Sequence, residues 1–169
     1  GEHTLRLQLV PAATVDGPAP TMPWALDVGY HAELPADDPD AALAVTTTLR
    51  RTDVVEGGTV ALDVIVTNTT ARDLPTPIAI VGLPAGCELP TRVLEDLQKG
   101  GAFAHWELRG RELVLYWRTL APRAEEKLTL DLITRVPGET TGPASRAWLY
   151  YTSSQKRWAA PLALTVRGR

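Results

Sequence analysis

Residues 82–101, GLPAGCELPTRVLEDLQKGG, contain the one convincing helix in a sequence that otherwise has the patterns of strands. Thr91 is the expected N-cap, since its hydroxyl can accept a hydrogen bond from a backbone N–H two or three residues on. The helix should end at the glycines 100–101, because glycine adopts the left-handed conformation without a Cβ penalty. About nine residues is below the ~12–15 that an isolated helix needs in water. We therefore expect this helix to dock on sheets through the apolar stripe Val93, Leu94 and Leu97.

The other side of the predicted helix is charged. Arg92, Glu95 and Lys99 lie at positions i, i+3 and i+7, so they share one side. The ordinary interpretation is a solvated helix face, and the sharper one is a surface that recognises a partner. The sequence leaves both open, and these three residues are the candidate partner-binding residues.

Strands are predicted on both sides of the helix. The clearest is 59–68, where Val60, Leu62, Val64 and Val66 alternate with more polar positions. An arginine-glycine-arginine turn at 109–111 predicts a hairpin, and the apolar run LVLYW within its second strand favours a central strand covered on both faces. Residues 54–58 are expected to form a turn, and 137–143 a loop. The other predicted strands are 43–49, 77–81, 103–108, 112–118, 127–136, 145–152 and 158–166.

This spacing of short strands predicts an all-β fold, an antiparallel β-sandwich of about eight strands with one short helix. Two further strands, 3–10 and 24–32, precede it and have the appearance of a separate piece. Between them and the sandwich, two prolines and three aspartates predict a linker. We therefore divide the chain into 1–36, a linker at 37–42, and a sandwich at 43–169.

Composition excludes some classes of protein. The chain has 169 residues, 44% hydrophobic and 22% charged, with a net charge of −3, which gives no electrostatic reason to expect nucleic acid as a partner. No run of 18 apolar residues occurs, so we expect no direct membrane insertion. The single cysteine excludes an internal disulfide, and we expect Cys87 to be a buried, inert thiol. Asn68 begins a glycosylation sequon, which matters only in a eukaryotic secretory pathway.

No catalytic constellation stands out. The three histidines are scattered over different predicted strands, and no serine has the glycines of a nucleophile elbow. The acidic cluster Asp37, Asp38 and Asp40 lacks the alternation of a calcium loop. We therefore expect no metal, no cofactor and no enzyme activity. Four tryptophans could form a sugar-stacking platform or serve as core and strand-pair aromatics, and we favour the second: Trp106, Trp117, Trp148 and Trp158.

The chain resembles a known family over roughly 85 residues. The segments GLP at 82–84, PTRVLE at 90–95, ELRGRELVLYW at 107–117 and GPASRAWLYYT at 142–152 are similar, in order and spacing, to the C-terminal receptor-binding domain of α2-macroglobulins, particularly the bacterial proteins. The sequence MPWAL at 22–26 resembles the trailing strands of the CUB domain that precedes it. Residues 1–36 would then be the second half of that CUB domain.

The resemblance implies a non-catalytic interaction domain at the end of a larger protease-trapping or defence protein. Such a domain would be extracellular or periplasmic. It would dock on the thioester and CUB domains of its parent after a conformational change, with a protease or a receptor as a further partner. The family's thioester motif is Gly-Cys-Gly-Glu-Gln, and Cys87 does not match it, because Pro90 stands where the glutamine should be. Of the family's two receptor-binding lysines, Glu88 replaces the first and Arg92 the second.

Two other classes of function stay open at this point. One is a free-standing β-sandwich module that binds carbohydrate or protein through its tryptophans or a sheet face. The other is a small hydrolase on a β-sandwich.

Overall fold

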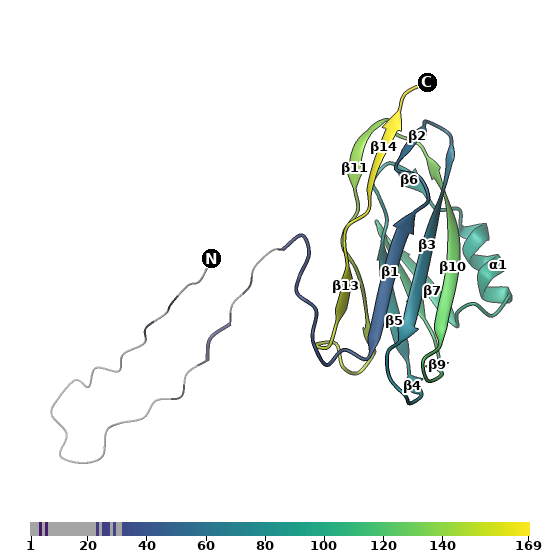
Figure 1. Cartoon of the computed structure of the whole chain (residues 1–169). Coiled ribbons are helices and arrows are strands. Elements are labelled where there is room, and N and C mark those ends of the chain that lie inside the picture. The colour runs from purple at the N-terminus through teal and green to yellow at the C-terminus, as the bar shows by residue number, and fades with distance from the viewer. Residues whose placement is uncertain (1–3, 5, 7–22, 24, 28, 30–31) are drawn as a thin grey trace, which may run out of the picture. The chain divides into compact units, whose positions relative to one another are not determined.

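The computed structural model describes residues 4, 6, 23, 25–27, 29 and 32–169 (Figure 1). The chain divides into two compact units, Gly1–His31 and Ala32–Arg169. The predicted strands at 3–10 and 24–32, and with them most of the CUB-like segment 1–36, lie outside the described residues. The fold described below is that of the second unit.

Within residues 32–169 the chain is built from strands and one helix. The elements in chain order are β1 (Leu43–Leu49), β2 (Asp53–Val55), β3 (Thr59–Asn68), β4 (Leu74–Pro75), β5 (Pro77–Gly82), β6 (Cys87–Glu88), α1 (Thr91–Lys99), β7 (His105–Arg109), β8 (Glu112–Tyr116), β9 (Thr119–Leu120), β10 (Glu125–Thr134), β11 (Gly138–Thr141), β12 (Ser145–Leu149), β13 (Arg157–Ala159) and β14 (Ala163–Arg167). This confirms the all-β class with one short helix.

Two sheets form the layers of the sandwich. One has the strand order β1-β3-β10-β6, and the other has the order β13-β12-β5-β8-β7. Their inner faces share one continuous core, because leucines and valines of both sheets belong to a single buried cluster. Two small sheets complete the fold, β11-β14-β2 and β4-β9. The pairing of β14 with β2 is parallel, whereas the other pairs are antiparallel.

Strand β3 is the middle of the first sheet, and its sequence explains why. Its side chains alternate strictly between buried and less buried positions, as the period of two in a strand requires. Val60, Leu62, Val64 and Val66 are all buried, as predicted. Alternation over ten residues fixes the register, since a slip by one residue would turn all four to the outside.

Strands β5 and β8 are the middle of the second sheet. All six residues of β5 are buried, and β8 pairs with it from Ile78–Tyr116 to Gly82–Glu112. Leu113 and Leu115 join the main core, whereas Val114 is buried on the opposite face of the same sheet. The predicted central strand with both faces covered is therefore confirmed, although it ends at Tyr116.

The structure corrects four local predictions. The strand predicted at 158–166 is divided into β13 and β14, which belong to different sheets. Residues 53–55, expected partly as a turn, form β2, and the turn is confined to Glu56 and Gly57. The predicted loop 137–143 contains β11, which pairs with β14. Thr91 is the first helical residue and not the N-cap. Pro90 occupies the N-cap with an extended backbone and makes no side-chain capping bond.

Helix α1 docks through the predicted stripe. Leu94 is fully buried in the core, and Val93 and Leu97 are partly buried against it. Gly101 has the left-handed φ of 81° expected after a helix end, whereas Gly100 keeps helical angles. The helix lies on the side of the sandwich away from β13 (Figure 1).

Asn68, at the end of β3, organises the turn that follows. Its side chain is fully buried, and its Nδ2 donates to the carbonyls of Arg72, Leu120 and Ala121 at 2.7, 3.1 and 2.8 Å. Its Oδ1 accepts the backbone N–H of Thr70 at 2.8 Å. The amide is thus engaged inside the fold, so the sequon is not an accessible glycosylation site in the folded domain.

Candidate docking surface

The two outer faces of the sandwich differ in polarity. Strand register places Thr48, Asp63 and Thr129 in one row across the outside of the sheet β1-β3-β10-β6. Arg50 adds a bidentate ion pair with Asp63, both contacts at 2.8 Å, and Thr129 donates to the same carboxylate at 2.7 Å. The Arg50 hydrogen bonds, followed by that of Thr129, lower the pKa of Asp63. This outer face is polar, and its charged groups form hydrogen bonds with one another.

The outer face of the other sheet carries a second apolar cluster, here called the aromatic face. Register places two rows of residues next to each other across β12, β5 and β8. Ile78, Ile80 and Val114 are buried there at 5%, 9% and 2% exposure although they lie outside the main core. Tyr116 and Trp148 are partly buried and pack against them. The apolar floor is therefore covered, and the partly exposed rings of Tyr116 and Trp148 are what this face presents to solvent.

Charged groups border the aromatic face. The Lys156 Nζ lies 5.1 Å from the ring centre of Trp148, and the guanidinium carbon of Arg146 lies 5.6 Å from that of Trp158. Arg146 also forms an ion pair with Glu112, at 2.7 and 3.2 Å. These cation–π contacts hold the long basic side chains over the aromatic rings and leave part of each ring accessible.

Glu107 lies at the opposite border of the aromatic face and orients Tyr116. Its Oε1 accepts the hydroxyl of Tyr116 at 2.9 Å, and its Oε2 accepts from Arg109. The Tyr116 hydrogen bond and then the Arg109 contact lower the pKa of Glu107. Burial, and then the bond to Glu107, raise the pKa of Tyr116. The tyrosine is therefore protonated and oriented at neutral pH.

Two tyrosines extend from the end of β12. Tyr150 is 57% exposed and Tyr151 is 84% exposed, and their rings meet edge to face with centres 5.1 Å apart. Exposed aromatic side chains with few rotatable bonds are effective contact residues. They adjoin the aromatic face because Tyr150 follows Trp148 by two residues.

The four predicted tryptophans divide between the two sides of the sheet. Trp117 is buried and donates its Nε1–H to the Ala102 carbonyl at 2.8 Å. Trp106 packs against the main core. Trp148 and Trp158 are on the outer side, where sequence patterns alone could not place them. Only the register of the strands places them there, since Trp158 is opposite Arg146 and Trp148 is opposite Ile78.

The predicted helix residues are all exposed. Arg92 has 90% of its side chain exposed, and its Nε lies 3.9 Å from a carboxylate oxygen of Asp96, one turn on. Glu95 and Lys99 are exposed on the same short helix. The three residues lie on α1, and no bond joins them to the aromatic face in the part of the chain that the structure describes. Their role as a partner-binding set stays a prediction.

Cys87 lies in β6 and is half-buried, not fully buried as expected. Burial raises the pKa of its thiol, which keeps the sulfur protonated and unreactive at neutral pH. Its neighbour Glu88 forms an ion pair with Arg135 at 2.7 Å.

The groups expected for hydrolysis are dispersed in the described part of the chain. Ser145 is buried, and its hydroxyl accepts the Gly82 backbone N–H at 3.0 Å. His105, whose ring lies 5.8 Å from that of Tyr116, is on another strand, and His3 and His31 lie outside the described residues. In that described part, no group of three or more metal-binding side chains occurs, and no helix is long and apolar enough to cross a membrane.

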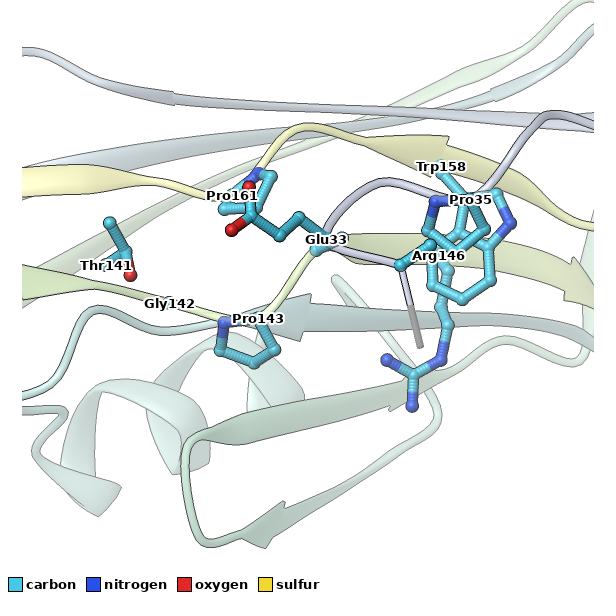
Figure 2. A pocket seen from close by; sticks show the side chains of 10 residues that line it. Glu33, Pro35, Thr141, Gly142, Pro143, Arg146, Trp158 and Pro161 are labelled. Atoms are coloured by element: carbon cyan, nitrogen blue, oxygen red, sulfur yellow. The ribbon is translucent and has the colours of Figure 1, made fainter. Parts of the chain in front are cut away.

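A cavity of about 380 Å³ opens beside the aromatic face (Figure 2). It lies in the gap between two strand pairings. The pairing of β12 with β13 ends at Ser145–Ala159, and the pairing of β11 with β14 ends at Thr141–Ala163. Pro143 and Pro161 face this gap, and proline cannot donate to a ladder. Arg146 and Trp158 form one end, and Glu33 extends across the opening (Figure 2).

Comparison with known proteins identifies the fold. No protein-family model and no curated protein matches the chain. Among solved structures, native Escherichia coli alpha-2-macroglobulin matches over 81% of this chain and 10% of its own, with a TM-score of 0.63 and 19% identity. The trypsin-activated E. coli protein matches over 79% and 11%, with a TM-score of 0.61 and 20% identity.

A shorter E. coli crystal structure locates the match. That structure holds only a part of native alpha-2-macroglobulin that runs to the C-terminus, and it matches over 79% of this chain and 25% of its own, with a TM-score of 0.60 and 18% identity. The chain therefore has the fold of a domain in the C-terminal region of bacterial alpha-2-macroglobulins. It spans about a tenth of the length of the larger structures.

Proposed function

We propose that the chain is a non-catalytic interaction domain of a larger alpha-2-macroglobulin-like protein, extracellular or periplasmic, that acts in protease trapping or defence. The observation that carries this proposal is the difference between the two outer sheet faces: one is polar and self-satisfied, and the other carries the aromatic face. The fold shared with bacterial alpha-2-macroglobulins supports the same conclusion.

The partner of the aromatic face is another domain of the same parent chain, either the thioester domain or the CUB domain. Trp148 and Tyr116 would be the central contacts, since large aromatic side chains provide most of the binding energy in interfaces. The apolar floor of Ile78, Ile80 and Val114 is already covered by them, so the free domain stays soluble. Docking would complete the burial of the two aromatic rings.

A docking domain acts through contacts that differ between two states of the whole molecule. A face that is covered before protease cleavage and open afterwards, or the reverse, would bias the parent between those states. The exposed charges Arg92, Glu95 and Lys99 on α1 are a second surface, suited to a protease or receptor after the rearrangement.

Footprinting of the natural parent protein tests this proposal. Hydroxyl radicals oxidise accessible Trp, Tyr and Ile side chains, so the rates at Trp148 and Tyr116 can be compared between the parent and the 169-residue chain. We expect oxidation at least ~5-fold slower in the parent, in one of its two states. Ile65, on the polar outer face, is the matched control and should react equally in both. Equal rates at Trp148 in the isolated chain and in both states of the parent would refute docking by this face.

A free-standing carbohydrate-binding module is the second candidate, favoured by the accessible rings of Trp148 and Trp158 next to a cavity. In that case glycan-array binding should disappear on Trp148→Ala and persist on Trp106→Ala, whose ring packs against the core. Absence of glycan binding by the unmodified domain would remove this candidate.

A further inference from the structure

Strand β13 is an outermost strand of its sheet, and its free edge is covered by the chain's own residues. The Trp158 backbone N–H donates to Oδ1 of Asp37 at 2.7 Å. Two residues earlier, the Lys156 carbonyl accepts the backbone N–H of Asp38 at 2.9 Å. One donor and one acceptor at this spacing are what a neighbouring strand would engage. Residues 37 and 38, at the start of the predicted linker, thus occupy part of the position of an added strand.

This cover is incomplete. One of its two hydrogen bonds comes from a side chain, so no regular ladder forms. Residues 32–36 make no hydrogen bond to the remainder of residues 37–169. Beneath them the cavity of about 380 Å³ is left unfilled between Pro35 and the side chains of Pro143, Trp158 and Pro161 (Figure 2). The chain's own segment therefore fits the site without filling it.

Charge favours an acidic occupant. Glu33, Asp37, Asp38 and Asp40 give residues 33–40 a charge of about −4 by count of their carboxylates. On the β13 side, Lys156 has no carboxylate within ion-pair distance among the described residues, whereas the charge of Arg146 is offset by Glu112. Arg157 lies on the other face of the sheet, since it is opposite the core residue Ala147. The site therefore keeps the uncompensated positive charge of Lys156.

We propose that the edge of β13 and the adjoining cavity form a binding site for an extended, acidic, proline-containing polypeptide, which the chain's own residues 33–38 occupy at rest. A peptide in trans would place a backbone carbonyl where the Asp37 carboxylate lies and so form a regular ladder, the β-augmentation mode of recognition. Its proline ring would fill the cavity against Trp158 and Pro161. This site adjoins the border of the aromatic face at Arg146, and the proposal does not depend on docking by that face.

The test uses the whole 169-residue chain and a fluorescent peptide of residues 32–40, AELPADDPD. In the unmodified chain the tethered segment competes at a millimolar effective concentration, so the peptide should bind weakly. Asp37→Ala removes the charge-assisted hydrogen bond from the tethered segment, which should tighten peptide binding by about 10-fold or more in fluorescence anisotropy. Asp40→Ala, with the same change of charge but outside the contact, should bind the peptide as weakly as the unmodified chain.

Three results would overturn the proposal: equal binding by the Asp37→Ala and Asp40→Ala chains, no binding by either, or equal binding of a scrambled peptide of the same composition. Hydrogen exchange gives a second measurement. The Trp158 amide should exchange about 10-fold faster in Asp37→Ala and at an unchanged rate in Asp40→Ala. In Asp37→Asn, which keeps a side-chain acceptor, the Trp158 amide should exchange at a rate between those of the Asp37→Ala and Asp40→Ala variants. An unchanged exchange rate of the Trp158 amide in all three variants would show that Asp37 does not cover the edge of β13.

Discussion

The docking of α1 can be tested by Leu94→Ala. Leu94 is fully buried at the centre of the helix stripe, and truncation to alanine removes about three carbon atoms. At ~0.8 kcal/mol for each buried methylene, the lost transfer free energy is about 2.4 kcal/mol. Leu94 belongs to the continuous buried core, so a cavity term adds to this loss. We expect the free energy of unfolding to fall by about 3 kcal/mol, within the range for buried leucines.

Urea denaturation followed by far-UV circular dichroism and tryptophan fluorescence measures this loss. The slope of free energy against urea should not change, because the unfolded surface is the same. Arg92→Ala on the same helix is the control and should stay within ~0.5 kcal/mol of the unmodified protein, since 90% of that side chain is exposed. A loss below ~1 kcal/mol for Leu94→Ala would show that the helix is peripheral and refute the reasoning.

The remaining predictions concern the sheets and can be measured in the same unfolding assay. Gly82→Ala should destabilise by at least ~2 kcal/mol, because a Cβ at this position would lie 1.8 Å from the Pro143 carbonyl oxygen; a neutral effect would contradict that close approach. Asn68→Ala leaves buried carbonyls without donors and should cost about 3 kcal/mol, and a loss under ~1 kcal/mol would mean that water replaces the amide. Hydrogen bonds from Tyr116 and then Arg109 lower the pKa of Glu107 in the folded state. The ionised carboxylate therefore stabilises the fold above about pH 4.3, and this stabilisation is lost as the pH falls through the lowered pKa of the folded state. Glu107→Gln should therefore lower the urea midpoint more at pH 7 than at pH 3, whereas an equal effect at both would exclude a role of the carboxylate charge.

Sequence patterns predicted most of the sandwich, because the relevant signals are local. The alternation in β3, the glycine turn between β7 and β8 and the apolar stripe of α1 each depend on a few neighbouring residues. The starts of β1 and β3 were also predicted correctly. The short strand β2 was missed, since its pairing partner β14 lies about a hundred residues away and three residues carry no period.

The candidate surface was harder to predict. Residues of the aromatic face come from β5, β8 and β12, and only the register of these strands shows that Trp148 lies beside Ile78. An apolar run such as that of β8 has no visible inner or outer side in the sequence. The attachment of residues 37–38 to β13 depends on one side chain and one backbone bond across 121 and 118 residues of sequence, and no local pattern indicates it.

The central claim is that this domain belongs to a much longer protein in which it docks on its neighbours. The most direct measurement is the mass of the natural product in the source organism, detected with an antibody raised against residues 32–169 and confirmed by mass spectrometry. The account predicts a product several times larger than the 18.3 kDa of this chain, since this chain spans about a tenth of the large structures that share its fold. A product of about 18 kDa would contradict it and make the free-standing binding module the better explanation.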